Sequence, residues 1–149
     1  KVNSLLERTI PRVVTIDLDL QENLEVVNAD PAQIEQVIVN LGINAAQAMR
    51  DGTGQIHISA EKHISLPDLV EIKVRDNGVG IPEKHHTALF DMFTRFHRDI
   101  ASGTGLGLSI AQDIIQDHGG WIVAESEPGR GTCFSIYLPM EEKECSTVS

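Results

Sequence analysis

Two glycine-rich clusters contain residues that could bind a ligand. Residues 76–82 read Asp-Asn-Gly-Val-Gly-Ile-Pro, and residues 103–108 read Gly-Thr-Gly-Leu-Gly-Leu. Glycine lets a backbone approach a ligand closely. The Asp76 carboxylate could accept a hydrogen bond from the exocyclic amine of adenine, and amides of the second cluster, at the start of a helix, could hold phosphates. Together the two clusters predict a nucleotide site.

Each cluster also has a simpler interpretation. Asn-Gly is a strong hairpin signal, so residues 76–78 could be only a turn, although residues 81–86 lack the alternation of a following strand. The second cluster could be a flexible loop with glycines at the start of a helix. It does not match the dinucleotide-binding fingerprint, and the chain has no Walker A loop. The nucleotide interpretation therefore depends on the clusters being taken together.

A row of amides lies on one face of the helix expected before the first cluster. Asn40 and Asn44 are four residues apart, and the same face carries Gln36 and Gln47. Neutral oxygen ligands of this kind suit a magnesium ion that keeps waters and is shared with phosphates. A polar seam exposed to solvent explains the row equally well.

Positive charge gathers between the two clusters. Lys84, Arg95 and Arg98 lie there with three histidines that we interpret as surface residues. The strongly anionic triphosphate of a nucleotide would be attracted by such a group, and a solvated surface is the alternative. The segment shows no sustained periodicity, and a loop of this length in a compact domain is typical of a lid.

Periodicity predicts the elements that must position these residues. Helices are expected at 2–10, about 30–49 and 106–118, the second beginning at Asp30 and Pro31, which suit a helix N-terminus. Gly119 and Gly120 are expected to end the third helix. Strands are expected at 13–20, 24–27, 55–61, 69–75, 121–125 and 132–138. This order predicts an α/β domain with about three helices over a mixed sheet.

Composition narrows the class of protein. The chain has 149 residues, enough for one domain, and a net charge of −10 that argues against nucleic acid as a partner. It has no apolar run of membrane-spanning length and no signal peptide, and its first residue is lysine, so we expect a fragment of a longer protein. The two cysteines, Cys133 and Cys145, form no disulfide framework, which favours a cytoplasmic setting.

Five motifs occur in order: an asparagine box at 40–45, a first glycine box at 76–80, a phenylalanine box at 90–93, a second glycine box at 103–108 and a third at 129–132. With them the chain resembles the catalytic, ATP-binding domain of bacterial sensor histidine kinases, in the superfamily that includes gyrase, a heat-shock chaperone and mismatch-repair ATPases. The resemblance implies the Bergerat fold, a two-layer α/β sandwich with a mixed sheet packed under three helices. It also implies a linker helix at 1–12, a catalytic domain at 13–140 with an ATP lid at about 82–104, and a flexible tail at 141–149.

The resemblance assigns a role to particular residues. Asp76 would bind the adenine amine, with Thr132 near the same ring. Asn40 and Asn44 would coordinate magnesium and, with Arg95 at the phosphates, make up the catalytic set. The other expected nucleotide-binding residues lie in the glycine clusters and are Gly78, Gly80, Ile81, Gly103, Thr104, Gly105, Leu106, Gly107 and Leu108. Many family members have lysine where this chain has Gln47, so more of the phosphate charge must be met by magnesium and arginine.

The implied function is transfer of the γ-phosphate of Mg-ATP to a histidine on a separate dimerisation domain, for relay to a response regulator. Hydrolysing relatives have a general-base glutamate where this chain has Asn40, and an amide cannot take a proton from water. The alternatives are an anti-sigma-factor type of serine kinase and an ATP-binding regulatory module that transfers nothing. None of the chain's histidines resembles the phosphoacceptor, so we expect the acceptor outside the chain. We also expect an isolated monomer without membrane contact.

Overall fold

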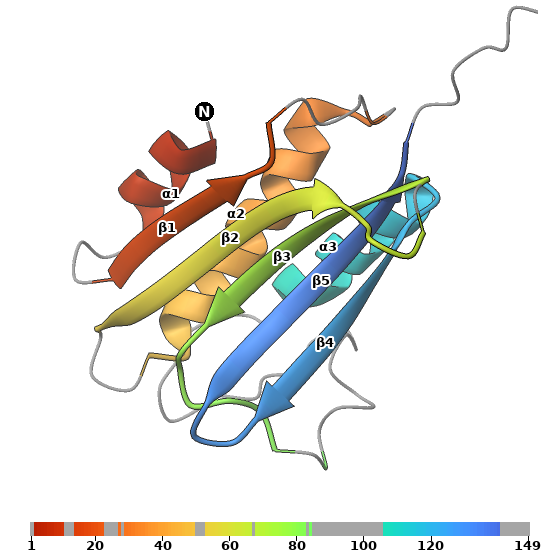
Figure 1. The fold of residues 1–149 in the computed structure, drawn as a ribbon. Coiled ribbons are helices and arrows are strands. Elements are labelled where there is room, and N and C mark those ends of the chain that lie inside the picture. Colours follow the sequence, from red (N-terminus) through yellow and green to blue (C-terminus); the bar gives the residue numbers. More distant parts are fainter. Residues whose placement is uncertain are drawn as a thin grey trace, which may run out of the picture.

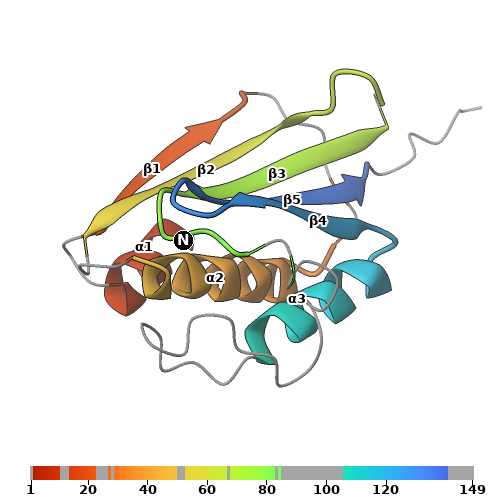
Figure 2. The same ribbon diagram turned by 90° about the horizontal axis from the view of Figure 1, so that it is seen from below.

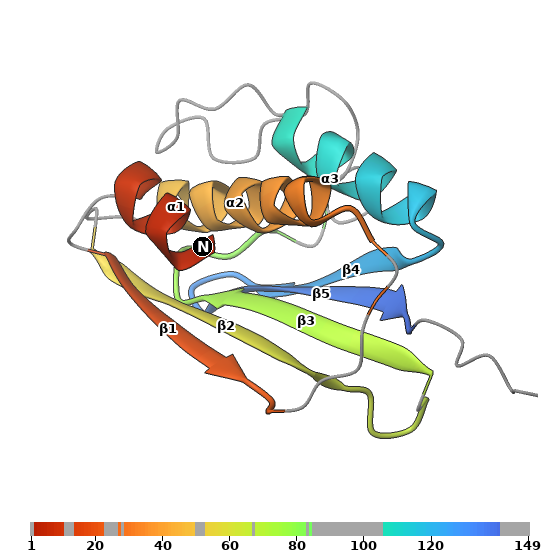
Figure 3. The same ribbon diagram turned by 90° about the horizontal axis from the view of Figure 1, so that it is seen from above.

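The described part of the protein has two layers, a five-stranded sheet and three helices on one of its faces (Figures 1 and 3). The computed structural model describes residues 2–10, 14–22, 27, 29–49, 53–66, 68–82, 84 and 106–140. In chain order, the elements in this part are α1 (Val2–Thr9), β1 (Val14–Leu20), α2 (Pro31–Gln47), β2 (Gly54–Lys62), β3 (Leu69–Asp76), α3 (Leu106–Asp117), β4 (Trp121–Glu127) and β5 (Gly131–Pro139). None of these helices has both the length and the apolar composition needed to cross a membrane.

The sheet is mixed, as the sequence predicts. Its strand order is β1-β2-β3-β5-β4, in which β1 and β2 are parallel and every other neighbouring pair is antiparallel. Of the strand expected at 24–27, only Val27 lies within the described residues, and it forms an isolated bridge with Met140. The β3–β5–β4 order brings the end of β3 next to the start of β5, which matters for the site below.

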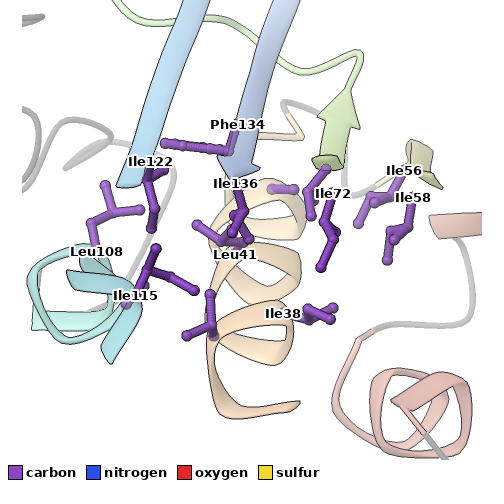
Figure 4. Close-up of a cluster of buried hydrophobic side chains, with 14 of the residues drawn as sticks. Ile38, Leu41, Ile56, Ile58, Ile72, Leu108, Ile115, Ile122, Phe134 and Ile136 are labelled. Atoms are coloured by element: carbon purple, nitrogen blue, oxygen red, sulfur yellow. The ribbon is translucent and has the colours of Figure 1, made fainter. Parts of the chain in front are cut away.

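The core lies between the sheet and the helices. Because side chains alternate along a strand, Phe134 and Ile136 of β5 both point to the helical layer, where they are fully buried. Leu41 of α2 and Ile115 of α3 meet them from the other side (Figure 4). The helices are therefore held to the sheet by apolar contact along their inner faces.

Helix α2 lies between α1 and α3 (Figure 2). On the α1 side, Leu6 is fully buried and Ile10 nearly so. A Cβ atom added at Gly42 of α2 would lie 2.7 Å from the Leu6 Cδ2 atom, so the absence of a side chain lets the two helices approach. Residues 2–10 therefore form part of the domain's own core.

The ends of the helices follow the capping signals in the sequence. The Asp30 carboxylate accepts a hydrogen bond from the Ala32 amide at 3.0 Å, as expected of an N-cap. At the end of α3, Gly119 has a φ of +78°, and the Gly120 amide donates to the Ile115 carbonyl at 2.9 Å. This is a Schellman ending, which needs a residue tolerant of positive φ.

His118 joins the end of α3 to the beginning of α2. Its Nδ1 atom lies 2.7 Å from the Ile114 carbonyl oxygen, and its Nε2 atom accepts a hydrogen bond from the Asp30 amide at 3.1 Å. Because a carbonyl can only accept and an amide N–H can only donate, these contacts need a neutral ring with its hydrogen on Nδ1. One imidazole thus ties together the ends of the two helices that carry the expected nucleotide-binding motifs.

Replacing His118 tests this connection. We expect His118→Ala to lower the free energy of unfolding by about 1–3 kcal/mol, since two neutral hydrogen bonds are lost. Urea unfolding followed by circular dichroism measures the loss. Gln116→Ala, at an exposed position of the same helix, is the matched control. Equal small losses in the two variants would show that the His118 contacts contribute nothing to stability.

Candidate nucleotide-binding site

The site is centred on Asp76, the last residue of β3, whose exposed fraction is only 4%. Its Oδ1 atom accepts hydrogen bonds from the Gly78 amide at 2.9 Å and the Thr132 amide at 3.3 Å. Both donors use the same oxygen, so among the described residues no donor reaches Oδ2. That oxygen is therefore the one through which the carboxylate can accept a hydrogen bond from a ligand.

The environment of Asp76 makes its negative charge costly. Burial raises the pKa of Asp76 from 3.8 to about 6, and the amide hydrogen bonds from Gly78 and Thr132 oppose part of that rise. At neutral pH the carboxylate is ionised but poorly solvated. A ligand that donates a hydrogen bond to it replaces solvation that folding has removed.

Within the described residues the first glycine cluster is a loop and no hairpin turn, because residues 77–82 form no strand and the next strand described is β4 at residue 121. The loop lies against the end of α2, where the Val79 amide donates to the Ala48 carbonyl at 3.0 Å. A Cβ atom at Gly78 would come within 2.6 Å of that carbonyl oxygen. Gly80 has a φ of +74°, and a Cβ atom there would clash with the Glu127 carbonyl. Both glycines are thus required by close backbone approach.

The turn between β4 and β5 supports the other side of the loop. The Gly129 amide donates to the Val79 carbonyl at 2.7 Å. A Cβ atom at Gly131, which has a φ of +107°, would clash with the backbone carbonyl of Asp76. The first and third glycine motifs, about fifty residues apart in sequence, therefore pack directly on each other.

Ser126 is a residue of the site that the sequence reasoning missed. Its hydroxyl oxygen accepts a hydrogen bond from the Ile81 amide at 2.7 Å and lies 2.9 Å from the Thr132 hydroxyl. The available signal was its place directly before the 128–131 turn, where hairpin register sets it opposite Thr132. A serine in a strand has too many ordinary explanations for that signal to single it out.

The two asparagines lie on α2, half-buried and one turn apart. The Asn40 Nδ2 atom lies 3.5 Å from the carbonyl oxygen of Gly107 in the first turn of α3, so α2 and α3 meet at this point. Within the described ranges no three His, Cys, Asp or Glu side chains gather to hold a metal. The side-chain amide oxygens of Asn40 and Asn44 are the candidate metal ligands here. Such ligands fit a magnesium ion that is shared with the phosphates of a bound ligand.

The remaining predicted residues divide into two groups. Arg95, Gly103, Thr104 and Gly105 lie outside the described residues, as does nearly all of the predicted lid. Leu106 and Gly107 open α3. The side chains of Ile81 and Leu108 belong to the apolar core, so these two residues can offer a ligand only their backbone.

Comparisons with known proteins identify the family to which the chain belongs. Residues 29–142 match the family model described as histidine kinase-, DNA gyrase B-, and HSP90-like ATPase. Sensor kinase CckA of Brucella abortus (strain 2308) is 40% identical over 153 residues, which cover 93% of this chain and 16% of that protein. The alginate biosynthesis sensor protein KinB of Pseudomonas aeruginosa is 41% identical over 138 residues, or 90% and 22% of the two chains. The chain thus spans less than a quarter of the length of these relatives.

Solved structures show the same fold. The nucleotide-free catalytic domain of the histidine kinase ThkA has a TM-score of 0.76 at 33% identity, covering 93% of this chain and 89% of that one. ThkA has also been solved in complex with the response regulator protein TrrA, with a TM-score of 0.73 at 32% identity over 94% of this chain and 38% of that one. The predicted two-layer fold is confirmed by this similarity.

Replacing Asp76 with asparagine should have opposite effects on the affinity for ATP and on the free energy of unfolding. Asn keeps the Oδ1 acceptor and removes the charge, so we expect affinity for ATP to fall about tenfold or more, the loss of a charged hydrogen bond. Because the folded pKa of Asp76 is above its unfolded value, ionisation costs stability as pH rises from about 4 to 6. Asp76→Asn is therefore more stable than the wild type at pH 7, by up to about 3 kcal/mol, with the difference shrinking towards pH 4.

Calorimetric titration with ATP and urea unfolding at pH 4 and pH 7 measure the two effects. Asp113→Asn, an exposed carboxylate on α3, is the control for loss of charge. Unchanged affinity in Asp76→Asn would mean that the first glycine cluster is only a structural loop.

Proposed function

Because the chain belongs to the family of histidine kinase-, DNA gyrase B- and HSP90-like ATPases, we propose that it is the ATP-binding catalytic domain of a sensor histidine kinase. In this role it transfers the γ-phosphate of ATP to a histidine on a separate dimerisation domain. The observation that carries the proposal is the buried Asp76 carboxylate, which the fold holds at the junction of two glycine motifs and whose Oδ2 atom has no donor among the described residues.

The adenine base is the part of the substrate that this site recognises. An ionised, poorly solvated Asp76 accepts a hydrogen bond from the exocyclic amine, and Thr132 lies at the same ring. The backbone of Gly78, Gly80 and Ile81 lies alongside. The phosphates extend towards the beginning of α3, where free amides and the helix dipole favour negative charge. Gly103, Thr104, Gly105 and Arg95 are assigned to the phosphates by their motifs alone.

Magnesium would be held by the amide oxygens of Asn44 and Asn40 together with the phosphates. Bound there, it supplies positive charge that neutralises the phosphate oxygens. Asn40 lies against the first turn of α3, so an ion at this asparagine is next to the helix end that faces the phosphates. Gln47 is half-buried and neutral, which leaves the ion and Arg95 to balance the phosphate charge.

Transfer to an acceptor is favoured over hydrolysis. Asn40 stands where hydrolysing relatives have a general base, and a neutral amide cannot take a proton from an attacking water. Phosphoryl transfer depends mainly on positioning and charge neutralisation, which this site provides. The acceptor histidine and any base belong to the dimerisation domain.

The partners of the proposed kinase follow from this division. ATP binds this chain, a dimerisation and phosphotransfer domain presents the histidine, and a response regulator receives the phosphoryl group. The ThkA–TrrA complex supports the response regulator as a partner, since the similarity to ThkA covers 94% of this chain. We propose that residues 1–12 lead in from the dimerisation hairpin, that the isolated domain is a monomer, and that it works in the cytoplasm.

The named relatives are sensor kinases, which favours histidine over serine as the acceptor. An anti-sigma-factor type of serine kinase has the same fold but usually an acidic residue in place of Asn40.

Asn44→Ala tests the metal site. We expect affinity for ATP in the presence of magnesium to fall about tenfold or more, while affinity in EDTA stays within twofold, because only the metal-dependent part is lost. Gln36→Ala, exposed on the same helix, is the control. An equal loss with and without magnesium would show that Asn44 supports the fold or the base and does not bind the ion.

Transfer is tested by supplying the acceptor. The chain is mixed with the dimerisation hairpin of its parent protein and radiolabelled ATP, and the labelled residue is identified by its acid lability. We expect an acid-labile phosphohistidine on the hairpin and no label on this chain. An acid-stable phosphoserine would favour the anti-sigma type, and ATP binding without any label would favour the regulatory module.

A further inference from the structure

The hydroxyl of Ser126 connects three parts of the nucleotide site. It accepts a hydrogen bond from the Ile81 amide at 2.7 Å, lies 3.1 Å from the Gly131 carbonyl oxygen and lies 2.9 Å from the Thr132 hydroxyl. These partners belong to the first glycine loop and the start of β5. Ser126 itself is on β4, directly opposite Thr132.

The chemistry of the partners decides where the hydroxyl hydrogens lie. A serine hydroxyl has one hydrogen and two lone pairs. The Ile81 amide can only donate, so it takes one lone pair, and the Gly131 carbonyl can only accept, so it takes the hydrogen. One lone pair is left, and all three contacts are made at once only if Thr132 donates its own hydrogen to Ser126.

This assignment determines what Thr132 offers to a ligand. With its hydrogen directed at Ser126, the Thr132 oxygen presents lone pairs alone. Thr132 is buried, and its amide donates to the Asp76 Oδ1 atom at 3.3 Å, so the two residues adjoin. An ionised carboxylate also presents lone pairs alone. The side chains of this part of the site are therefore all acceptors.

We propose that Ser126 is a positioning residue that makes the site selective for a 6-aminopurine over a 6-oxopurine. An exocyclic amine has two hydrogens to give to such acceptors, whereas a 6-oxo group would face them with lone pairs of its own. A buried polar group left unpaired in this way is the strongest source of discrimination between similar ligands. This inference rests on the proposed function, because it assumes that the base binds at Asp76.

Ser126 also holds the glycine loop in place. The Ile81 side chain is anchored in the core with 1% of its surface exposed, and its amide is fixed by Ser126. Loss of the hydroxyl would free the Ile81 amide and the Thr132 hydrogen together. The first effect lowers affinity for every nucleotide, and the second changes which base is preferred.

The test compares ATP with inosine triphosphate, which differs in having a 6-oxo group and N1–H. Calorimetric titration of the full chain with each nucleotide gives two affinities for the wild type and for Ser126→Ala. We expect Ser126→Ala to bind ATP about three- to tenfold more weakly, as for loss of one neutral hydrogen bond. The ratio of ATP to inosine triphosphate affinity should fall at least about fivefold, because the freed Thr132 hydrogen can now be donated to the 6-oxo group.

Ser126→Thr, which keeps the hydroxyl, should restore the ratio. Ser135→Ala removes another buried serine of the same sheet and should leave it unchanged. If Ser126→Ala does not fold, Ser126→Cys carries the same test, since a thiol is a weak donor and acceptor. A variant that loses affinity for both nucleotides in equal proportion overturns the proposal and leaves Ser126 a structural role. Failure of the wild type to bind ATP would instead refute the proposed function.

Discussion

The buried carboxylate at the end of β3 dictates how closely the loop and the strands around it approach one another. Asp76 is removed from water, and burial raises its pKa to about 6, so the folded chain holds a charge that it solvates only in part. The amides that do solvate it come from Gly78, two residues on, and Thr132, on the neighbouring strand. Both must approach closely, which explains why glycines flank the carboxylate in sequence and in space. Burial of this charge lowers the free energy of unfolding, and a ligand that donates a hydrogen bond to Asp76 can restore part of that loss.

The same need for close approach recurs wherever the elements converge. Gly42 lets α1 lie against α2, and Gly78 lets the loop reach the Ala48 carbonyl at the end of α2. Asn40 on α2 also contacts Gly107 of α3, where a side chain at the glycine would still fit. Helix α2 takes part in all three contacts and is thus the element against which the others are placed. His118 adds a hydrogen-bonded tie at the far end of the same pair of helices. The α2–α3 pair around the site is thus held by the apolar core that both helices share, by the Asn40–Gly107 contact and by the His118 hydrogen bonds.

Different parts of the molecule contribute to different parts of the proposed reaction. In this proposal the base is recognised by buried groups that the sheet and the helices hold in place and that cannot rearrange without cost. Phosphate binding is assigned to a segment between residues 84 and 106, and the acceptor to another domain. A domain that binds the nucleotide but leaves the acceptor to another domain is suited to transfer controlled by that partner.

The class of fold and the carboxylate at the centre of the candidate site could both be predicted from the sequence. Alternating strands, the Asp30–Pro31 helix start and the Gly119–Gly120 ending are local signals, and local signals survive in a single chain because they reflect backbone conformation over a few residues. The motifs indicated Asp76, because they can be recognised from their order along the chain. Only the folded structure shows that Thr132 donates its amide to Asp76, that Leu6 and Ile10 belong to the core, and that the Ser126 hydroxyl contacts Ile81, Gly131 and Thr132. Most of these contacts join residues far apart in sequence. A serine hydroxyl cannot be recognised as a positioning group until the fold places its three partners around it.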